Sequence, residues 1–308
     1  MSATKIQWTE ATWNPVRGCS RISPGCENCY AERQAARFNG RCGALSEWTG
    51  KVELVLDMLD LPMRRKKPTT YDVSSMSDLF HESLPDEEID EVFAVMAMCP
   101  QHMFRVQTKR ADRMRKYALG IGTTSVRRRI DALIAGDVDW PLPNVWMGVS
   151  VENQKYADER IPLLLQTPAA VRFVSAEPLL GALDLYCYLP LAANCDSEGV
   201  HRLGTRCPDC GDVCNNDDRM NRHLDWVIVG GESGPGARPF DIAWARDIIR
   251  QCRVAGVAPF VKQLGSDPRE GNRNGSGYVR LRLKDRKGGD MSEWPEDVRV
   301  RERPESSQ

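Results

Sequence analysis

Six short apolar runs, each followed at once by polar or charged residues, alternate with segments of helical periodicity along most of this chain. The runs are Tyr71–Ser74, Met103–Gln107, Val145–Val149, Val171–Val174, Trp226–Val229 and Pro259–Val261. Runs that are apolar throughout are typical of strands buried on both faces, and strands that alternate with helices indicate parallel βα units. The pattern therefore predicts an α/β fold built as a parallel (β/α) partial barrel, with an open doubly wound sheet as the alternative.

The polar residues that follow these runs are candidates for a binding site. In a parallel barrel or sheet the carboxyl ends of the strands lie on one side, where ligands bind. Carboxylates there suit a cationic ligand, whereas hydroxyl, amide and ammonium groups suit a carboxylate or a sugar. A structural role as a helix cap or turn residue is the alternative for each of them. The candidates are Ser75, Ser77, Asp78, Lys109, Ser150, Glu152, Asn153, Glu177, Gly230, Gly231, Glu232 and Lys262.

Three cysteines, Cys19, Cys26 and Cys29, stand at C-x6-C-x2-C spacing in the loop of residues 16–30. Pro24 and Gly25 bend the chain between them, so that three thiolates can point at one spot. Three sulfurs are one short of the four that close a structural zinc site or an ordinary iron–sulfur cluster. We therefore favour a cluster with one open iron over a zinc site completed by a distant residue or three unligated thiols.

The helical segment Tyr30–Phe38 would begin beside these thiols. Backbone N–H groups at a helix N-terminus favour a negatively charged group, which suits a thiolate-bound cluster. Cys42 follows a turn near the first three cysteines and is a less favoured fourth ligand. Cys99 and Cys252 lie on apolar faces of helical patterns and are predicted to be small core residues.

A second group of cysteines lies in residues 187–223, an insertion in the strand–helix pattern. Its Cys207-Pro-Asp-Cys210-Gly-x-x-Cys214 sequence has the form of a zinc knuckle, in which a tight turn lets backbone N–H groups face two sulfurs. We predict a Zn2+ site here, with a second iron–sulfur cluster or free thiols as alternatives. The candidates for the remaining ligand are Cys195, which we take first, and Cys187, His201 and His223.

The overall composition is that of an ordinary globular protein. Hydrophobic residues make up 41% and charged residues 28%, and the formal net charge of −1 gives no global attraction to nucleic acid or membranes. No stretch approaches the roughly 18 apolar residues of a membrane span, and residues 1–8 lack the apolar core of a signal peptide. We therefore expect a cytoplasmic location, where the eleven cysteines serve as metal ligands or buried thiols rather than disulfides.

Several longer motifs are similar to those of one known family. They are Trp13–Pro15 before Gly18-Cys19, Ser23–Ala31, Ser75–His81, Gly148–Asn153, Ser175–Gly181 and Val229–Pro235. On these motifs, which recur in order at the predicted strand ends, residues 5–265 resemble the phage-type three-cysteine-motif proteins. This bacterial and bacteriophage family has no settled function and is similar to radical S-adenosylmethionine enzymes.

The resemblance implies a [4Fe-4S] cluster on Cys19, Cys26 and Cys29. Its open iron would bind S-adenosylmethionine, and an electron donor would reduce it. Two features depart from the pattern of radical S-adenosylmethionine enzymes. Their usual spacing is C-x3-C-x2-C, whereas six residues fill the first gap here, and their Gly-Gly-Glu motif usually follows the second strand. In this chain the corresponding Gly230–Glu232 follows a late strand.

These observations predict one domain, residues 1–265, followed by a charged and mobile tail, residues 266–308, in which Tyr278–Leu283 forms an edge hairpin. The expected function is that of an iron–sulfur enzyme that cleaves S-adenosylmethionine reductively to act on an unknown substrate, with nucleic acid as one candidate. The alternative is a non-enzymatic, metal-stapled protein that binds nucleic acid or a protein partner. Basic runs such as 109–116 are interpreted as solvated faces, because acidic residues are interspersed nearby.

Overall fold

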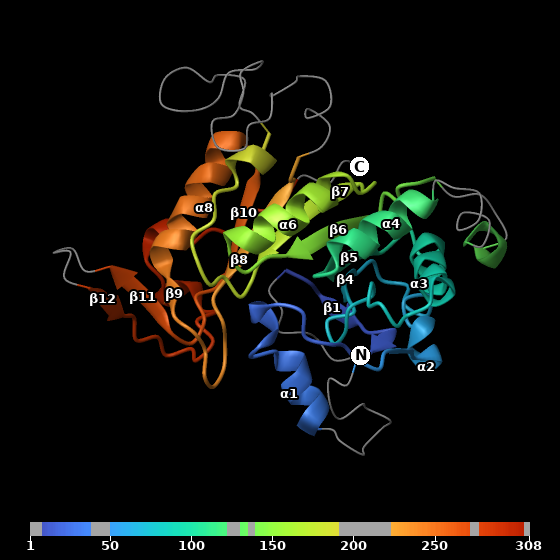
Figure 1. Ribbon diagram of the computed structural model, residues 1–308, viewed down its shortest axis with the longest axis horizontal. Helices are drawn as coiled ribbons and strands as arrows, with labels where there is room; N and C mark the ends of the chain where they lie inside the picture. The colour runs from blue at the N-terminus through green and yellow to red at the C-terminus, as the bar shows by residue number, and fades with distance from the viewer. Residues whose placement is uncertain are drawn as a thin grey trace.

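The computed structural model describes residues 8–37, 50–121, 130–134, 139–190, 223–271 and 277–304. Its centre is a parallel sheet of seven strands that curls into half a barrel (Figure 1). The strands lie in the order β1, β4, β5, β6, β7, β8 and β10. They span Ala11–Trp13, Thr70–Val73, Met103–Thr108, Val145–Ser150, Val171–Ala176, Trp226–Gly230 and Ala258–Gln263.

The order of the strands decides between the two folds expected from the sequence. Neighbours in this sheet are also successive in the chain, so the order never reverses. A doubly wound sheet reverses its order at a switch point, where its ligands bind. The partial barrel is therefore confirmed and the doubly wound alternative is wrong. Ala11–Trp13 adds a seventh strand to the six that the sequence predicts. It pairs with β4 and is too short to show a pattern.

Four helices, α3, α4, α6 and α8, cover the outer face of the sheet (Figure 1). Local signals set their ends, because the side chains of Asn153 and Asp241 accept hydrogen bonds from backbone N–H groups in the first turns of α6 and α8. Gly256 ends α8 with a φ of 70°, which favours glycine. The helices span Asp86–Met98, Ala111–Ile121, Gln154–Leu165 and Ile242–Ala255.

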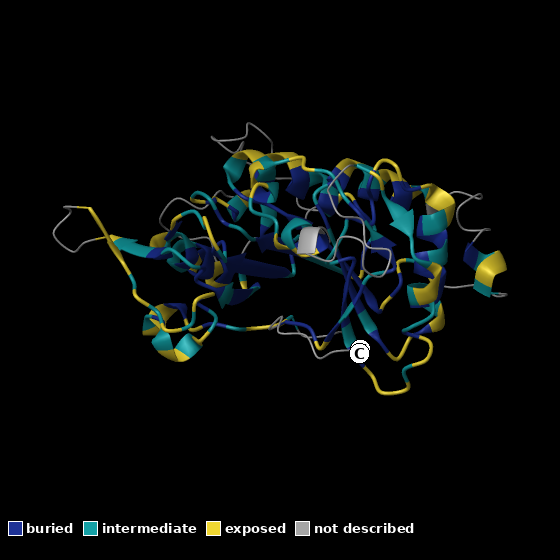
Figure 2. Ribbon diagram, turned by 90° about the horizontal axis from the view of Figure 1, so that it is seen from below, coloured by how far each residue is buried: buried dark blue, intermediate teal, exposed yellow. Residues whose placement is uncertain are grey.

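The strands bury both faces, as their apolar runs predict. Outward side chains such as Val106 and Val149 pack with Ile161 and Ile248 of the helices in the main core. Figure 2 shows the buried strands lined on their outer side by helices whose outward surfaces are exposed. The predicted core cysteines, Cys99 and Cys252, are likewise buried. Inward side chains form a second cluster of Trp8, Trp146, Phe173, Trp226, Ile228 and Phe260.

This inner aromatic cluster is tightly fitted. Gly148 on β6 leaves room for the ring of Phe173, with which a Cβ at this position would collide. The guanidinium of Arg105 lies 5.0 Å from the ring centroid of Trp146 and 4.7 Å from that of Trp226. A cation between two indole faces is held by their quadrupoles. The cluster fills one end of the half-barrel, and the carboxyl ends of the strands lie at the other.

Smaller elements surround this frame. A two-stranded ribbon of β2 and β3 lies near the start of the chain, and α1 and α2 follow its two strands. A three-stranded sheet of β9, β11 and β12 lies on the far side of α8 in Figure 1. The bounds are Val16–Arg17 for β2, Tyr30–Arg37 for α1, Glu53–Leu54 for β3 and Leu56–Leu59 for α2. Those of the three-stranded sheet are Phe240–Asp241 for β9, Pro268–Gly271 for β11 and Tyr278–Arg280 for β12. β12 lies within the predicted segment Tyr278–Leu283, but its antiparallel partner is β11, which lies outside that segment.

The segment after residue 265 differs from the mobile tail that its charge predicts. Trp294 and Val298 are fully buried in the main core. The backbone N–H of Val261 on β10 donates to the carbonyl of Val300 at 2.8 Å, so the segment pairs with the edge of the sheet. Its few apolar residues are separated by charged ones, which hides this packing in the sequence.

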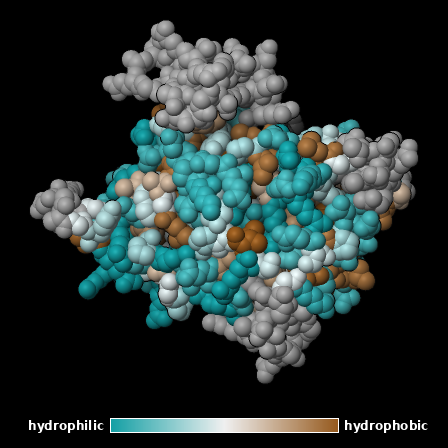
Figure 3. Space-filling model, in the orientation of Figure 1, coloured by the Kyte–Doolittle hydropathy of each residue, from teal (hydrophilic) through white to brown (hydrophobic). Residues whose placement is uncertain are grey.

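The outer surface fits a protein whose helices turn polar faces to solvent. The face in Figure 3 is mostly hydrophilic, with small and separate hydrophobic patches. No helix in the described part of the chain has the length and apolar character needed to cross a membrane. Two sequence predictions lie outside the described residues: the role of Cys42, and the zinc site of Cys195, Cys207, Cys210 and Cys214.

Candidate functional site

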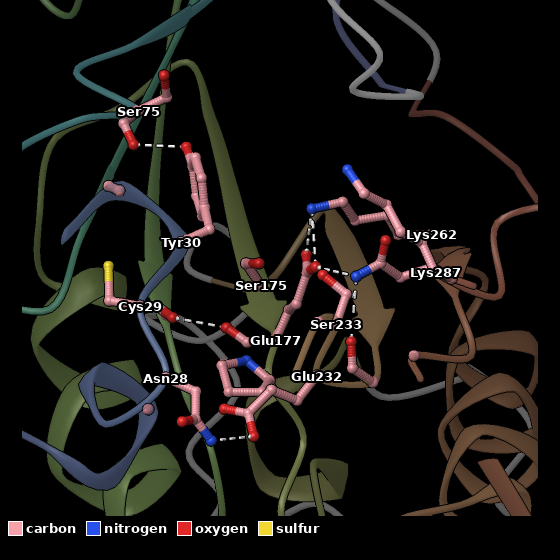
Figure 4. Close-up of a pocket in the computed structure, with 18 of the residues that line it drawn as sticks. Asn28, Cys29, Tyr30, Ser75, Ser175, Glu177, Glu232, Ser233, Lys262 and Lys287 are labelled. Atoms are coloured by element: carbon pink, nitrogen blue, oxygen red, sulfur yellow. Dashed lines mark hydrogen bonds and ion pairs between the residues drawn. The ribbon is translucent and has the colours of Figure 1, made fainter. Parts of the chain in front are cut away.

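An open cavity of about 2350 Å³ lies at the carboxyl ends of the strands. Its lining includes Cys19, Cys26 and Cys29 together with residues that follow the sheet strands (Figure 4). The strand-end candidates that line it are Ser75, Ser77, Asp78, Lys109, Ser150, Glu177, Gly231, Glu232 and Lys262. Three candidates lie outside the lining: Glu152, Asn153 and Gly230. Most of the polar residues predicted from their positions after the strands thus lie in one place, beside the cysteine loop.

The serines at the end of β4 hold the cysteine loop in position. The hydroxyl of Ser77 donates to the carbonyl of Val16 at 2.8 Å, and that of Ser75 donates to Oδ1 of Asn14 at 3.1 Å. At the other end of the loop, the hydroxyl of Tyr30 donates to the carbonyl of Ser75 at 2.5 Å (Figure 4). Both ends of the loop are therefore fastened to the end of one strand.

Glu152 supports the middle of the same loop from a fully buried position. The hydroxyl of Ser23 donates to its carboxylate, and Arg160 pairs with it at 3.2 Å. The backbone of Gly25 lies so close that a Cβ there would collide with this carboxylate. Glu152 therefore positions the loop from behind, while Asn153 caps α6.

Arg110 links the first cysteine to the end of β5. Its guanidinium donates to Oδ2 of Asp78 at 3.1 Å and to both carboxylate oxygens of Glu82 at 2.9 Å. It also donates to Oγ of Ser20 at 2.8 Å, and its Nη1 lies 3.8 Å from Sγ of Cys19. Burial and the charge of Asp78 raise the pKa of the Cys19 thiol to about 12, although Arg110 opposes this rise. A metal that binds Cys19 must therefore displace a tightly held proton.

The carboxylate of Asp78 is occupied by the protein itself. Besides Arg110, it accepts hydrogen bonds from the hydroxyl of Thr108 at 2.6 Å and the backbone N–H of Lys109 at 3.2 Å. His81, in the turn that follows β4, is buried beside Ser20, with its Nε2 2.8 Å from Oγ of Ser20. Burial, and next the charge of Arg110, lower the pKa of His81. It serves as a neutral support for the turn.

Glu232 joins the late Gly230–Glu232 motif to the cysteine loop. The side chain of Arg238 donates to Oε1 at 2.6 Å and to Oε2 at 3.0 Å. The amide of Asn28, between two of the cysteines, donates to Oε2 at 2.9 Å (Figure 4). Burial alone would raise the pKa of Glu232, but these bonds outweigh it and lower the pKa. Glu232 is therefore ionised, and both of its carboxylate oxygens accept hydrogen bonds.

Glu177 and Lys262 form an ion pair on the opposite wall. Nζ of Lys262 lies 2.7 Å from Oε1 of Glu177, and the amide of Gln263 donates to the same carboxylate at 3.2 Å (Figure 4). The ammonium of Lys262 also lies 4.2 Å from the ring centroid of Trp8. Both charged groups are mostly buried yet line the cavity, so a ligand can exchange places with either partner.

The three thiols of the loop all line the cavity. In a tetrahedral zinc site each sulfur lies about 2.3 Å from the metal, which brings the sulfurs within about 4 Å of one another. Within the described ranges no three His, Cys, Asp or Glu side chains are close enough to hold one ion. Cys19, Cys26 and Cys29 nevertheless line one cavity as free thiols. Thiolates are the usual ligands of iron–sulfur clusters, so Cys19, Cys26 and Cys29 could hold one.

Sequence reasoning misses the charged residues that organise the site. Arg110 and Arg238 look like ordinary surface charges in the sequence, and only their contacts with Asp78 and with Pro24 and Glu27 of the cysteine loop reveal their role. Asp72 and Arg105 lie inside otherwise apolar strand runs, at opposite positions in the register of β4 and β5. A charged residue within an apolar run was the available signal, because a strand buried on both faces accepts one only where it faces a polar space.

Comparison with family models finds one match, over residues 3–293, to a family described as proteins of unknown function, DUF5131. The chain belongs to the DUF5131 family. The matched range includes all seven strands of the half-barrel and every residue that lines the cavity. No curated protein and no solved structure matches this DUF5131 chain. Membership therefore assigns no activity, and the chemistry must be argued from the site.

Proposed function

We propose that this DUF5131 protein is an iron–sulfur enzyme that binds S-adenosylmethionine in the cavity and cleaves it reductively, as radical S-adenosylmethionine enzymes do. The observation that carries the proposal is the convergence of three thiols from one loop with polar strand ends of a parallel half-barrel. Cys19, Cys26 and Cys29 would hold a [4Fe-4S] cluster. When bound and reduced by an external donor, the cluster supplies the electron that breaks the sulfonium carbon–sulfur bond.

The residues around the loop would fix its geometry for that cluster. Glu152 and Ser77 support the loop from behind and at its start, and Arg110 holds the backbone and side chain of Ser20 next to Cys19. Arg110 also places positive charge beside a sulfur, which compensates the negative charge of a thiolate-bound cluster. These contacts preorganise the ligands, so little ordering remains for metal binding.

The cofactor needs partners for its carboxylate and for its cationic groups. Lys109 lines the cavity, and its ammonium has no ion-pair partner in the described ranges, so it is available for a carboxylate. Lys262 can offer a second ammonium by exchange with Glu177. Glu232 already accepts hydrogen bonds at both carboxylate oxygens, so we assign it to positioning of the loop.

Anaerobic reconstitution tests the proposal. The wild-type chain should bind about four irons, show visible charge-transfer absorption and release 5′-deoxyadenosine from S-adenosylmethionine under dithionite. Cys19→Ala, Cys26→Ala and Cys29→Ala should each lose this iron and abolish the release. Cys187→Ala removes an exposed thiol outside the cavity and should change neither.

A positional variant separates the thiols themselves from their arrangement. Gly25→Ala keeps all three thiols but pushes the loop off Glu152, so iron incorporation should fall severalfold. Gly271→Ala meets no atom within 4 Å and should bind iron as the wild type does. A colourless protein that binds only zinc and yields no deoxyadenosine would reject the proposal and favour the metal-stapled binding protein.

A further inference from the structure

One acid in the cavity has no hydrogen-bond or ion-pair partner among the residues that the structure describes. The other acids that line it, Asp78, Glu177, Glu232 and Asp285, accept hydrogen bonds at distances of 3.2 Å or less. Asp72, by contrast, is 8% exposed and makes no hydrogen bond or ion pair with any residue in the described part of the chain. Its carboxylate oxygens face the cavity with their full capacity to accept hydrogen bonds. Because buried polar groups normally have hydrogen-bond partners, a ligand is expected to supply the missing ones.

Ser74, two residues further along, shows the same deficiency. It lines the cavity, is 3% exposed, and its buried hydroxyl has no partner among the described residues. Its φ of 58° puts a non-glycine residue in the left-handed region, which costs free energy. Unsatisfied buried polar groups and local strain at one strand end are typical of a binding site, where a ligand completes the hydrogen bonds.

The charges around Asp72 indicate a neutral ligand. Its carboxylate faces Lys262 from β10 and Arg105 from β5 as cations, Glu177 after β7 as an anion, and the phenol of Tyr30 on α1. Two cations and two anions cancel, so a cationic ligand would leave an excess positive charge in a partly enclosed site. Hydroxyl groups bring donors without charge, and neighbouring hydroxyls suit a carboxylate, as where an acidic residue binds a ribose in dinucleotide folds.

We infer that Asp72 and Ser74 form a subsite for the neighbouring hydroxyls of a ribose, with the carboxylate of Asp72 accepting both and Ser74 binding beside it. The inference rests on the proposed function in one respect, because S-adenosylmethionine carries such a ribose. Asp72 lies on the cavity wall formed by the second strand of the sheet, next to Thr12 of β1 in register. A nucleoside bound there would lie between the cysteine loop and Lys262.

The empty subsite should lower the free energy of unfolding at neutral pH. Burial raises the pKa of Asp72 to about 6, against the attraction of Lys262 and Arg105. The folded state therefore holds this proton more tightly than the unfolded chain, whose aspartate pKa is about 3.9. The stabilising effect is complete below about pH 4 and is lost as the pH rises through 6. At neutral pH the empty protein carries an unfavourable charge that Asp72→Asn removes.

A cycle of paired changes in ligand and protein tests the contact. Binding of adenosine and of 2′,3′-dideoxyadenosine is measured by calorimetry on the full-length chain at pH 7.5. Loss of the two hydroxyls should weaken binding to the wild type by roughly ten- to a hundredfold, but binding to Asp72→Asn by less than about threefold. Ser74→Ala should weaken adenosine binding. Glu159→Gln, an exposed acid on α6, is the matched control and should behave as the wild type.

Thermal unfolding gives a second readout that a structural role would not produce. Asp72→Asn should raise the melting temperature by about 2–4 °C at pH 7.5, and the gain should shrink towards pH 5. Equal losses on removal of the hydroxyls in both proteins, no measurable adenosine binding, or a lower melting temperature for Asp72→Asn would overturn the subsite. If deoxyadenosine is released but removal of the hydroxyls weakens binding equally in both proteins, the proposed function stands and the subsite is rejected. If the two losses differ but the protein binds no cluster, the subsite stands and the proposed function is rejected.

Discussion

At the scale of single residues, the site depends on side chains that each serve several groups at once. Arg110 is the clearest case, because its fork reaches Asp78, Glu82 and Ser20 and its Nη1 lies beside the sulfur of Cys19. A planar guanidinium can bridge such a set in fixed directions, whereas an ammonium cannot. The position of the first cysteine is therefore set by a residue that follows the third strand of the sheet.

Arg110→Lys tests this bridging role without removing the charge. The side chains of Arg110 and Asp78 are 5% and 7% exposed, so the hydrogen bonds that lysine cannot replace are lost in a desolvated place. We expect the free energy of unfolding to fall by about 2–3 kcal/mol, measured by urea denaturation. Arg64→Lys changes an exposed pair with Asp60 and should cost less than about 1 kcal/mol. Equal losses in the two variants would contradict the role assigned to Arg110.

The sequence identifies most of the polar residues in the site but not their partners. Residue types at strand ends predict Asp78, Glu177 and Glu232 as lining residues, and all three line the cavity. Their partners stand 32, 85 and 6 positions away in the chain, and no local pattern links them. Whether a carboxylate is free or occupied depends on these distant contacts. For this reason the unpartnered acid, Asp72, becomes visible only in the structure.

At the scale of strands and helices, the inner face of the sheet depends on close fitting between neighbours. Gly148 of β6 faces Phe173 of β7 in register, and the ring takes the space that a side chain would need. Gly148→Ala should therefore push Phe173 into the other rings of the aromatic cluster. We expect a loss of about 1–3 kcal/mol in the free energy of unfolding by urea denaturation.

The matched control for this element is Gly271→Ala at the end of β11, where an added methyl group meets open space. Its free energy of unfolding should stay within about 0.5 kcal/mol of the wild type. A Gly148→Ala protein as stable as this control would show that the aromatic cluster can repack, and the floor of the cavity would then be adaptable rather than fixed.

Element boundaries follow the sequence closely wherever local signals are strong. α8 begins after the Asp241 cap and ends at Gly256, and α3 buries Ile89, Val92, Phe93 and Met96 at helical spacing. The six mainly apolar runs all become strands, because such a run is most stable where both faces of the strand are buried. β1 escapes prediction, since its three residues gain their pairing from β4, about sixty positions later.

At the scale of the whole molecule, the two edge strands of the half-barrel differ in whether another segment pairs with them. β1 is one edge of the sheet, whereas the other edge, β10, is paired by residues close to the C-terminal end. Trp8 bridges the opening, since it packs edge-on against Phe260 of β10 at 6.3 Å between ring centroids. Arg301 reinforces this closure by donating to the carbonyls of Val261 and Lys262. The strand that carries Lys262 is therefore held in place by the last described residues of the chain.

Deletion of residues 290–308 tests whether this segment belongs to the folded domain. The deletion removes Trp294 and Val298 from the core and leaves the edge of β10 unpaired, so both burial and backbone pairing are lost. Full burial of an apolar side chain contributes about 1.5–3 kcal/mol, and an open edge strand promotes association. We expect the shortened protein to melt at least 5 °C lower, or to aggregate, in thermal unfolding followed by light scattering.

Deletion of residues 305–308 alone keeps every described contact and should leave the melting temperature unchanged. If both deletions melted like the full-length chain, the segment would be a dispensable tail after all, and the position of Lys262 would have to be maintained by the sheet alone.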